Sequence, residues 1–244
     1  MARRRFFVQQ IRNGQAEIAG DEAYHLTRVL RVEEGQIYEI SDGAQVWLAR
    51  VSEARKGRVA FETGEIVEPN PPPVRIAVYA GLIKFDRFEA GLEKCTEVGV
   101  ERIVPVICGR SENGLERAVE KRRSRWERIL LEASQQSRRD RVPELGDPID
   151  FDEAAAAPGD TRLFLEEQPG AAPLLRALPE PERRMATDVV ALLVGPEGGW
   201  TDGERALAAK GLWTPVSLGV QILRADTAAS VAAALVAAAW QSGA

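Results

Sequence analysis

The chain has 244 residues, of which 45% are hydrophobic and 28% are charged, and its formal net charge is −5. This apolar content is enough for one large domain or two smaller ones, and the charged content argues against wholesale disorder. The net charge gives no overall signature of nucleic-acid binding, although an average can conceal a local basic surface.

The chain contains two cysteines and one histidine, which are few ligands for a zinc site. Cys95 and Cys108 form no CxxC pair, and His25 is the only histidine, so no zinc site is expected. We predict two buried free thiols in a reducing cytoplasm. No long apolar segment follows the N-terminal arginines, and the apolar stretch 225–240 is shorter than a bilayer requires. We therefore expect a cytoplasmic protein without a metal site or a membrane span.

Residues 1–68 are typical of a small β-barrel-like module. The segments 36–41, 45–52 and 57–67 alternate as half-buried strands do, with turns between them. Residues 21–31 predict a short helix that Asp21 caps. Residues 69–73 are rich in proline, which stiffens a chain and interrupts regular structure, so we predict a linker there.

Residues 74–244 alternate between strand-like and helix-like patterns. Strands are expected at 74–82, 102–108, 161–167, 189–194 and 214–219. Helices are expected at 85–99 and from Glu116 to Arg139. Continuous apolar runs such as VVALLV suit a parallel sheet that is covered on both faces. The sequence therefore predicts an α/β domain.

The stretch LLVGPEGGW, residues 192–200, joins one of these strands to a helix. Thr201 and Glu204 match a capping box, so the loop GPEGG lies at the carboxyl end of a strand, where α/β sheets bind ligands. Glycines let a ligand approach the backbone closely, although a plain connection has the same local pattern. The loop matches neither a P-loop nor GxGxxG. The anionic Glu197 disfavours phosphate and suits a ligand with a cationic or amine-bearing part.

The stretch VSLGVQILRADTAAS, residues 216–230, is a second junction of this kind. A short strand ends near Gly219, and a helix is expected to begin near Asp226 or Thr227. Two glycine-bearing loops at one sheet edge can form opposite walls of a pocket. Arg224 and Asp226 are candidate catalytic groups, but a local ion pair between them explains the same residues.

Basic residues are concentrated between positions 121 and 141, with eight lysines and arginines against three acids. Arg3, Arg4 and Arg5 form a second group. Arginine binds phosphate bidentately and stacks on bases, so we favour RNA binding, although a solvated helix face explains such charge as well. His25 shares a possible helix face with Arg28 and Arg31, for which we also favour RNA contact over catalysis.

Together these stretches resemble the RsmE family of SPOUT methyltransferases, which methylate N3 of a uridine in 16S ribosomal RNA. The similarity covers nearly the whole chain, because HLTRVLR, KFDRFEAGLEKCTEVGV, ICGRSE, RWERILLEASQQSRRDRVPEL, LFLEE, GPEGG and ILRADTA follow the family's order. It implies an α/β protein with a PUA-like β-barrel (1–68), a linker (69–73) and a SPOUT domain (74–244) that contains a trefoil knot. Topology rules alone argue against a knot. The resemblance also implies a homodimer, S-adenosylmethionine as cofactor, and 16S rRNA of the small ribosomal subunit as partner.

The resemblance assigns roles to individual residues. The implied cofactor pocket consists of Leu193, Gly195, Pro196, Glu197, Gly198, Leu218, Gly219, Ile222, Leu223, Arg224, Thr227 and Ala228. Uracil N3 must lose its proton before it can attack the methyl group, so Glu166 or Asp226 is expected to accept it, directly or through water. Arg224 is expected to stabilise charge on the uracil oxygens. The residues that we predict to bind RNA are Arg5, His25, Arg28, Arg31, Arg110, Arg122, Arg123, Arg125, Arg138 and Arg139.

Two positions depart from the family pattern. Gln221 stands where the family usually has arginine, and Asp226 stands where it usually has glutamate. Two alternative functions stay open: a non-catalytic RNA-binding or assembly factor, and a nucleotide-dependent enzyme that binds phosphate at GPEGG. The intact glycine loops count against the first, and the missing P-loop lysine counts against the second.

Overall fold

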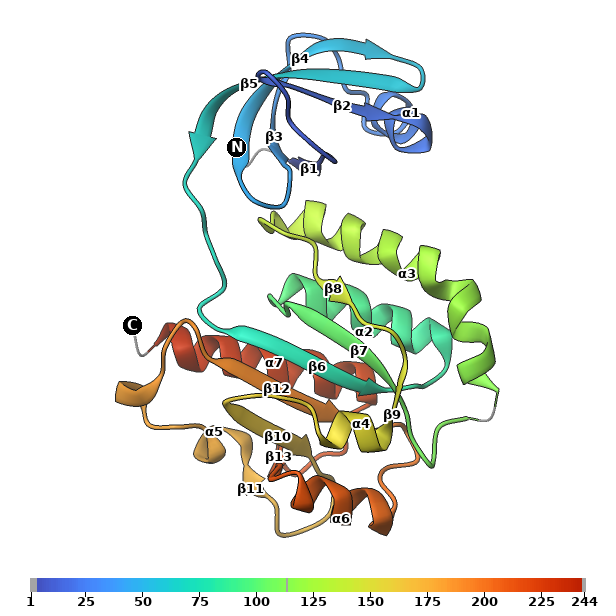
Figure 1. Cartoon of the computed structure of the whole chain (residues 1–244), viewed down its shortest axis with the longest axis vertical. Coiled ribbons are helices and arrows are strands. Elements are labelled where there is room, and N and C mark those ends of the chain that lie inside the picture. The colour runs from blue at the N-terminus through green and yellow to red at the C-terminus, as the bar shows by residue number, and fades with distance from the viewer. Residues whose placement is uncertain (1–3, 113, 243–244) are drawn as a thin grey trace. The chain divides into compact units, whose positions relative to one another are not determined.

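The computed structural model describes residues 4–112 and 114–242, which form two compact units (Figure 1). The first unit contains the chain up to Pro71 together with Ser134–Val142, and the second contains Pro72–Ala133 and the chain from Pro143 onward. The division at Pro71 lies within the proline-rich stretch.

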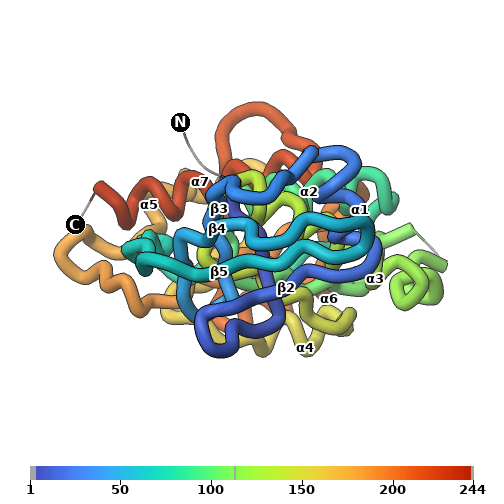
Figure 2. The backbone as a smooth tube through the Cα atoms, turned by 90° about the horizontal axis from the view of Figure 1, so that it is seen from above, coloured from blue at the N-terminus to red at the C-terminus, as the bar shows by residue number. Residues whose placement is uncertain are grey.

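The first unit is built on a five-stranded sheet in the order β1, β3, β4, β5, β2. These strands are β1 (Arg5–Phe7), β2 (Gln15–Ala19), β3 (Ile37–Ser41), β4 (Val46–Arg55) and β5 (Arg58–Val67). Only β1 and β3 pair in parallel, and Figure 2 shows β3, β4, β5 and β2 side by side. Alternate residues point inward, so Ile18 of β2 packs with Phe6 and Phe61 in one core.

The helix of this unit, α1 (Gly20–Arg28), differs from the prediction at both ends. The residue before it is Ala19, with no side-chain cap, so the prediction that Asp21 caps the helix is wrong. Asp21 lies inside the first turn, where a carboxylate still interacts favourably with the helix dipole. The helix ends before Arg31, whose positive φ of 52° is incompatible with further helix.

Buried ion pairs explain why Ser134–Val142 belongs to the first unit although it lies within the range expected for the α/β domain. Arg5 is 3% exposed, and its guanidinium binds Glu39 at 3.0 Å, Asp140, and the carbonyl oxygen of Arg138. The Ser41 hydroxyl also donates to the carbonyl oxygen of Asp140 at 2.7 Å. Such pairs join segments that are distant in sequence, which local patterns do not reveal.

The second unit has an eight-stranded sheet whose pairs are all parallel. Seven strands follow the order β11 (Ala172–Pro173), β13 (Thr214–Ser217), β10 (Thr161–Leu165), β12 (Val189–Val194), β6 (Arg75–Gly81), β7 (Arg102–Ile107), β8 (Glu144–Leu145). The eighth, β9 (Ile149–Asp150), pairs with β7. The five strands predicted for this region are all present, and the mixed α/β class is confirmed.

Helices cover both faces of this sheet. On one face α2 (Phe85–Glu97) contacts α7 (Ala225–Gln241), and α7 contacts β6 and β12. On the other, α4 (Phe151–Ala155) contacts α6 (Asp202–Lys210), next to a core cluster that includes Leu193 of β12. The helix α3 (Leu115–Ser137) buries Trp126 against the ring of Phe88 in α2, with ring centroids 4.6 Å apart. Two short elements, α5 (Leu174–Ala177) and the 3-10 turn Pro181–Arg183, lie between β11 and β12.

Both cysteines are free and buried, as predicted. Burial raises the pKa of each thiol, Cys95 and Cys108, to about 12. None of the described helices is long and apolar enough to cross a membrane. Among the described residues, no group of three or more His, Cys, Asp or Glu side chains is placed to hold a metal ion.

Candidate functional site

Three chain segments meet at the carboxyl edge of the second unit's sheet. Because β10 pairs with both β12 and β13, the loops that follow these three strands are neighbours. They enclose a cavity of about 360 Å³. It is lined by Leu165–Glu167, Val194–Glu197, Gly199, Trp200 and the continuous run Val216–Ala225, with Ala228. The two glycine-bearing loops are therefore opposite walls of one cavity, as predicted.

Most residues of the predicted pocket line this cavity, and three do not. Those that do are Gly195, Pro196, Glu197, Leu218, Gly219, Ile222, Leu223, Arg224 and Ala228. Leu193 instead points into the core cluster of α4 and α6. Gly198 faces Arg110, whose guanidinium donates to the Gly198 carbonyl oxygen at 2.9 Å. Thr227 lies in the first turn of α7, outside the lining residues.

Trp200 fixes the floor of the GPEGG loop. Its ring stacks on Phe164, with centroids 4.6 Å apart, and its indole N–H donates to the Leu165 carbonyl oxygen at 2.8 Å. A Cβ atom on Gly195 would lie 3.0 Å from the Trp200 ring. The first glycine of the loop therefore packs closely against a buried aromatic ring, with little room for a side chain.

The predicted capping box of α6 is confirmed, and it also anchors a neighbouring loop. Thr201 accepts from the Glu204 N–H, and Glu204 Oε2 accepts from the Thr201 N–H at 2.7 Å. Glu204 Oε1 accepts from the Gly109 N–H at 2.8 Å. Together with the contact between Arg110 and Gly198, this bond ties the segment after β7 to the GPEGG loop. Arg110, predicted to contact RNA, thus has a bond within the protein that positions this loop.

Glu166 lines the cavity but is bound to Arg205 of α6. Arg205 Nε donates to Glu166 Oε2 at 2.7 Å, and the backbone N–H groups of Glu167 and Gln168 donate to Oε1. Burial acts to raise the pKa of Glu166, but the hydrogen bonds from Arg205 and from this backbone outweigh it and lower the pKa. The carboxylate is therefore ionised and held in one orientation.

Asp226 faces away from the cavity and pairs with a residue of α2. Lys94 Nζ lies 2.8 Å from Asp226 Oδ2. Burial acts to raise the pKa of Asp226, but the hydrogen bond and the charge of Lys94 lower it overall. The alternative of a local pair between Arg224 and Asp226 is wrong, because Arg224 forms no ion pair within the described part of the chain. Arg224 is exposed at the cavity and precedes the first residue of α7.

Glu197 is also paired, with Arg87 of α2. Arg87 Nε lies 3.1 Å from Glu197 Oε1, and both side chains are partly exposed. This pair links α2 to the middle of the GPEGG loop. Glu197 thus has a structural role in holding the wall of the cavity.

Some of the arginines predicted to bind RNA are engaged within the first unit instead. Arg5 is buried in the ion-pair cluster of the first unit, and Arg138 binds Glu39 there, so the expectation that Arg5 contacts RNA is wrong. Arg139 donates to the Arg141 carbonyl oxygen at 3.2 Å. Arg3 lies outside the described residues.

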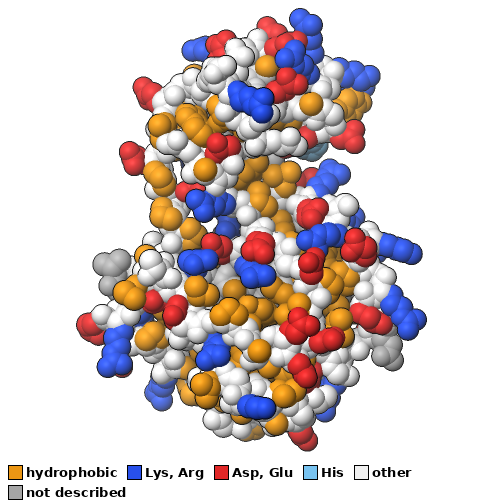
Figure 3. Space-filling view, viewed as in Figure 1, with side chains coloured by type: hydrophobic (Ala, Val, Ile, Leu, Met, Phe, Trp, Pro, Cys, Tyr) orange, Lys and Arg blue, Asp and Glu red, His pale blue; other side chains and the backbone are white. Residues whose placement is uncertain are grey.

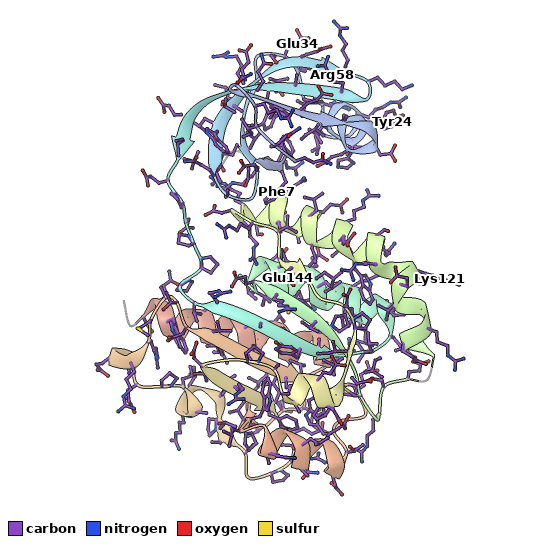
Figure 4. The ribbon with its side chains drawn as sticks, viewed as in Figure 1. Phe7, Tyr24, Glu34, Arg58, Lys121 and Glu144 are labelled. Carbon is purple, nitrogen blue, oxygen red and sulfur yellow. The ribbon has the colours of Figure 1, made fainter. Side chains whose placement is uncertain are left out.

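Arginines of α3 are largely neutralised by acids of the same unit. Glu89 of α2 is 8% exposed and binds Arg125 at 2.7 Å and Arg122 at 3.4 Å. Arg123 binds Glu127 and Asp147, at 3.1 and 2.8 Å. On the face shown in Figure 3, basic and acidic side chains are interspersed. Lys121, by contrast, projects from α3 away from the ribbon (Figure 4). The local excess of positive charge is therefore much smaller at the surface than in the sequence.

The basic residues in α1 and directly after it are more exposed to solvent. Arg28 and Arg31 are exposed and His25 is half-buried. The guanidinium of Arg28 lies 5.3 Å from the ring centroid of Tyr24, and Lys56 Nζ lies 5.8 Å from it. Figure 4 shows Tyr24 on α1 at the surface of this unit. An exposed aromatic ring beside cations is typical of RNA-binding surfaces.

Several residues that shape the site were missed by reasoning from the sequence. They are Arg87, Lys94, Glu167, Trp200 and Arg205. The partners of Arg87, Lys94 and Arg205 lie far away in sequence. Trp200 follows GPEGG directly, and a large aromatic residue at the end of a glycine loop is the one local signal that was available.

Comparison with known proteins identifies related families for both units. The profile of an RNA methyltransferase domain matches residues 70–237, and that of an RNA methyltransferase PUA domain matches residues 18–63. A Synechocystis protein named ribosomal RNA small subunit methyltransferase E is 33% identical over 93% of this chain and 74% of its own length. A protein of the same name from Mycobacterium bovis is 31% identical over 89% of this chain and 84% of its own length.

Solved structures of methyltransferases also resemble this chain over nearly its whole length. The ribosomal RNA small subunit methyltransferase E of Neisseria gonorrhoeae, bound to S-adenosylmethionine, has a TM-score of 0.82 and 30% identity over 96% of both chains. A Legionella pneumophila structure that also contains S-adenosylmethionine has a TM-score of 0.86 and 27% identity over 98% of both chains.

Proposed function

The chain belongs to the RNA methyltransferase family that includes ribosomal RNA small subunit methyltransferase E, and we propose that it methylates small-subunit rRNA with S-adenosylmethionine. The observation that carries this proposal is the single cavity formed by both glycine loops and the end of β10. Its lining contains most of the residues that the resemblance assigns to the cofactor. The methyl acceptor is N3 of a uridine in 16S rRNA.

The lining fits the chemistry of S-adenosylmethionine, which supplies a methyl group on a positively charged sulfur. Glu167 brings negative charge to one part of the cavity, where Glu166 and Glu197 also lie, each paired with an arginine. Leu218, Ile222 and Leu223 give an apolar wall to the other, which suits a flat aromatic base. The carboxylate of Glu167 beside the GPEGG loop disfavours a phosphate group at that loop.

Arg224 is the residue that we assign to the charge that develops on uracil. N3 becomes nucleophilic only when its proton leaves, and negative charge then spreads to the two carbonyl oxygens. A guanidinium that is exposed at the cavity and has no ion pair among the described residues is available to stabilise that charge. The base must leave its helical stack to reach the cavity.

Of the two candidate proton acceptors, Glu166 is better placed than Asp226. Glu166 lines the cavity, whereas Asp226 is directed toward Lys94. The lowered pKa of Glu166 makes it a weak base, so proton transfer depends on the uracil being acidified by Arg224. We assign the proton acceptor role to Glu166, directly or through water, and a positioning role to Asp226.

The RNA is held in this proposal by the first unit and by exposed cations of α3. His25 and Arg28 of α1, and Arg31 just after it, are the proposed contacts of the first unit. In the second unit, Lys121 is a better candidate than Arg122, Arg123 and Arg125, which are engaged by acids.

A homodimer and a trefoil knot complete the proposal. The outer face of α7 is apolar and only partly buried, with Val231, Ala234 and Leu235 half-exposed. Val220 and Ile222, which line the cavity at its edge toward solvent, are 96% and 80% exposed. A second copy of the chain would cover such a surface, and we propose that the protein acts as a cytoplasmic homodimer.

Binding and transfer can be tested separately. Calorimetric titration with S-adenosylmethionine distinguishes an enzyme from a non-catalytic assembly factor, which would bind RNA alone. Purified small subunits that lack the modification are then incubated with the methyl-labelled cofactor. Transfer to rRNA is expected, and RNA binding without cofactor binding would support the assembly factor.

A further inference from the structure

Two of the three carboxylates at the cavity are engaged by arginines. Glu166 binds Arg205 at 2.7 Å and Glu197 binds Arg87 at 3.1 Å. Each of these pairs holds a loop in place. Both carboxylates are thus held in place by an arginine of the protein.

Glu167 is the third, and its carboxylate has no hydrogen bond or ion pair within the described residues. Its backbone N–H donates to Glu166 Oε1 at 3.0 Å, so the main chain at this position is held by the pair between Glu166 and Arg205. The side chain is exposed and lines the cavity. Glu167 therefore has a fixed backbone and a carboxylate that is available to a ligand.

The GPEGG loop leaves room for this carboxylate. A Cβ atom on Gly199 would lie 2.6 Å from Glu167 Oε1, which is closer than real atoms approach. Gly199 also has a φ of +67°, which other residues rarely adopt. The missing side chain of Gly199 therefore allows Glu167 to lie over the loop that forms the cavity wall.

The position of Glu167 in the sheet indicates what it binds. It follows β10, the immediate neighbour of β12, and β12 leads into the glycine loop. In dinucleotide-binding α/β sheets, an acidic residue that follows the glycine-rich loop in sequence accepts a hydrogen bond from the ribose. Glu167 precedes its glycine loop in sequence, but it lies at the same sheet edge, after the strand that pairs with β12. The two oxygens of a carboxylate also match two adjacent hydroxyl groups. We propose that Glu167 accepts hydrogen bonds from the 2′- and 3′-hydroxyl groups of the cofactor ribose, an inference that rests on the proposed function.

Calorimetry on the full chain tests this contact with three ligands. They are S-adenosylmethionine, 5′-methylthioadenosine, which lacks the amino-acid part, and 2′-deoxy-5′-methylthioadenosine. We expect Glu167→Ala to weaken the first two by at least about tenfold, because it removes the charge-assisted hydrogen bonds from both hydroxyl groups. Its effect on the deoxy ligand should be clearly smaller. Glu182→Ala, which removes an exposed carboxylate away from the cavity, should change none of the three affinities.

The outcomes separate this inference from the proposed function. If the unmodified chain binds S-adenosylmethionine and Glu167→Ala binds all three ligands equally well, the inference is wrong and the function stands. If Glu167→Ala weakens the binding of S-adenosylmethionine but not of the other two ligands, Glu167 contacts the ammonium group of the cofactor. That result would also overturn the inference that Glu167 binds the ribose. If the unmodified chain binds none of the ligands, the proposed function itself fails. Unchanged melting temperatures of both variants show that folding is intact.

Discussion

Arg205 Nε lies 2.7 Å from Glu166 Oε2, and this pair connects the start of α6 to the end of β10 at the cavity. Arg205 also donates to the Trp200 carbonyl oxygen at 2.8 Å. One guanidinium therefore positions both a carboxylate of the cavity and the residue that supports the GPEGG loop. Arg205 acts through these contacts and is a positioning residue.

Replacing Arg205 should weaken cofactor binding without unfolding the protein. In Arg205→Ala, Glu166 loses its orienting partner and Trp200 loses a backbone contact. We expect the Kd for S-adenosylmethionine, measured by calorimetry, to rise by roughly tenfold. Arg176→Ala, which removes an exposed arginine away from the cavity, is the matched control. Equal affinities of the two variants would show that the pair has no role in the site.

The same pair predicts a pH dependence of stability. The pKa of Glu166 is lowered from its ordinary value of 4.5, so the ionised form is favoured in the folded protein. Its contribution is fully present above pH 4.5 and is lost as the pH falls through the lowered pKa. Urea unfolding of the unmodified chain and of Glu166→Gln should therefore differ at pH 7 and converge in acid. A difference that persists unchanged into acid would contradict this assignment.

Gly195 should not tolerate a branched side chain. A Cβ atom there would lie 3.0 Å from the Trp200 ring, which is stacked on Phe164 and cannot move freely. We expect Gly195→Val to lose measurable binding of S-adenosylmethionine and to shift the emission of Trp200. Gly203→Ala, in the first turn of α6 with no close neighbour, is the control and should bind normally. Normal binding by Gly195→Val would show that the loop is not the cofactor wall.

The arginines of α3 should affect stability more than RNA binding. Arg125→Ala leaves the buried carboxylate of Glu89 with only the longer contact to Arg122, and we expect a loss of about 1 kcal/mol. Lys121→Ala should leave the free energy of unfolding unchanged but reduce RNA affinity and its salt dependence. Urea unfolding and fluorescence titration with rRNA fragments measure the two effects. The reverse pattern would show that Arg125 contacts RNA.

Local patterns predicted most of the regular structure. The strands 74–82, 102–108 and 189–194 were visible because their apolar runs are continuous and end at turns or glycines. The capping box at Thr201 was recognisable from spacing alone. The start of α1 was not recognisable from the sequence, because Ala19 precedes the helix with an extended backbone and no side chain caps it.

Long-range pairing limited the prediction of the site. The sequence identified the two glycine loops, but it did not reveal that Lys94 and Arg87 of α2 bind Asp226 and Glu197. Nor did it show that Arg5 is buried with Glu39. The sequence does not distinguish a charged side chain that is exposed to solvent from one that contacts RNA or pairs with a distant acid. These cases can be separated only once the fold is known.

Transfer of a labelled methyl group to small-subunit rRNA tests the central claim most directly. Unmodified small subunits are incubated with the chain and with S-adenosylmethionine labelled on its methyl group, and the rRNA is digested to nucleosides. We predict label in a single product, 3-methyluridine, and none with Gly195→Val. Absence of label from the rRNA, while the chain binds the cofactor and the subunits are intact, would contradict the account.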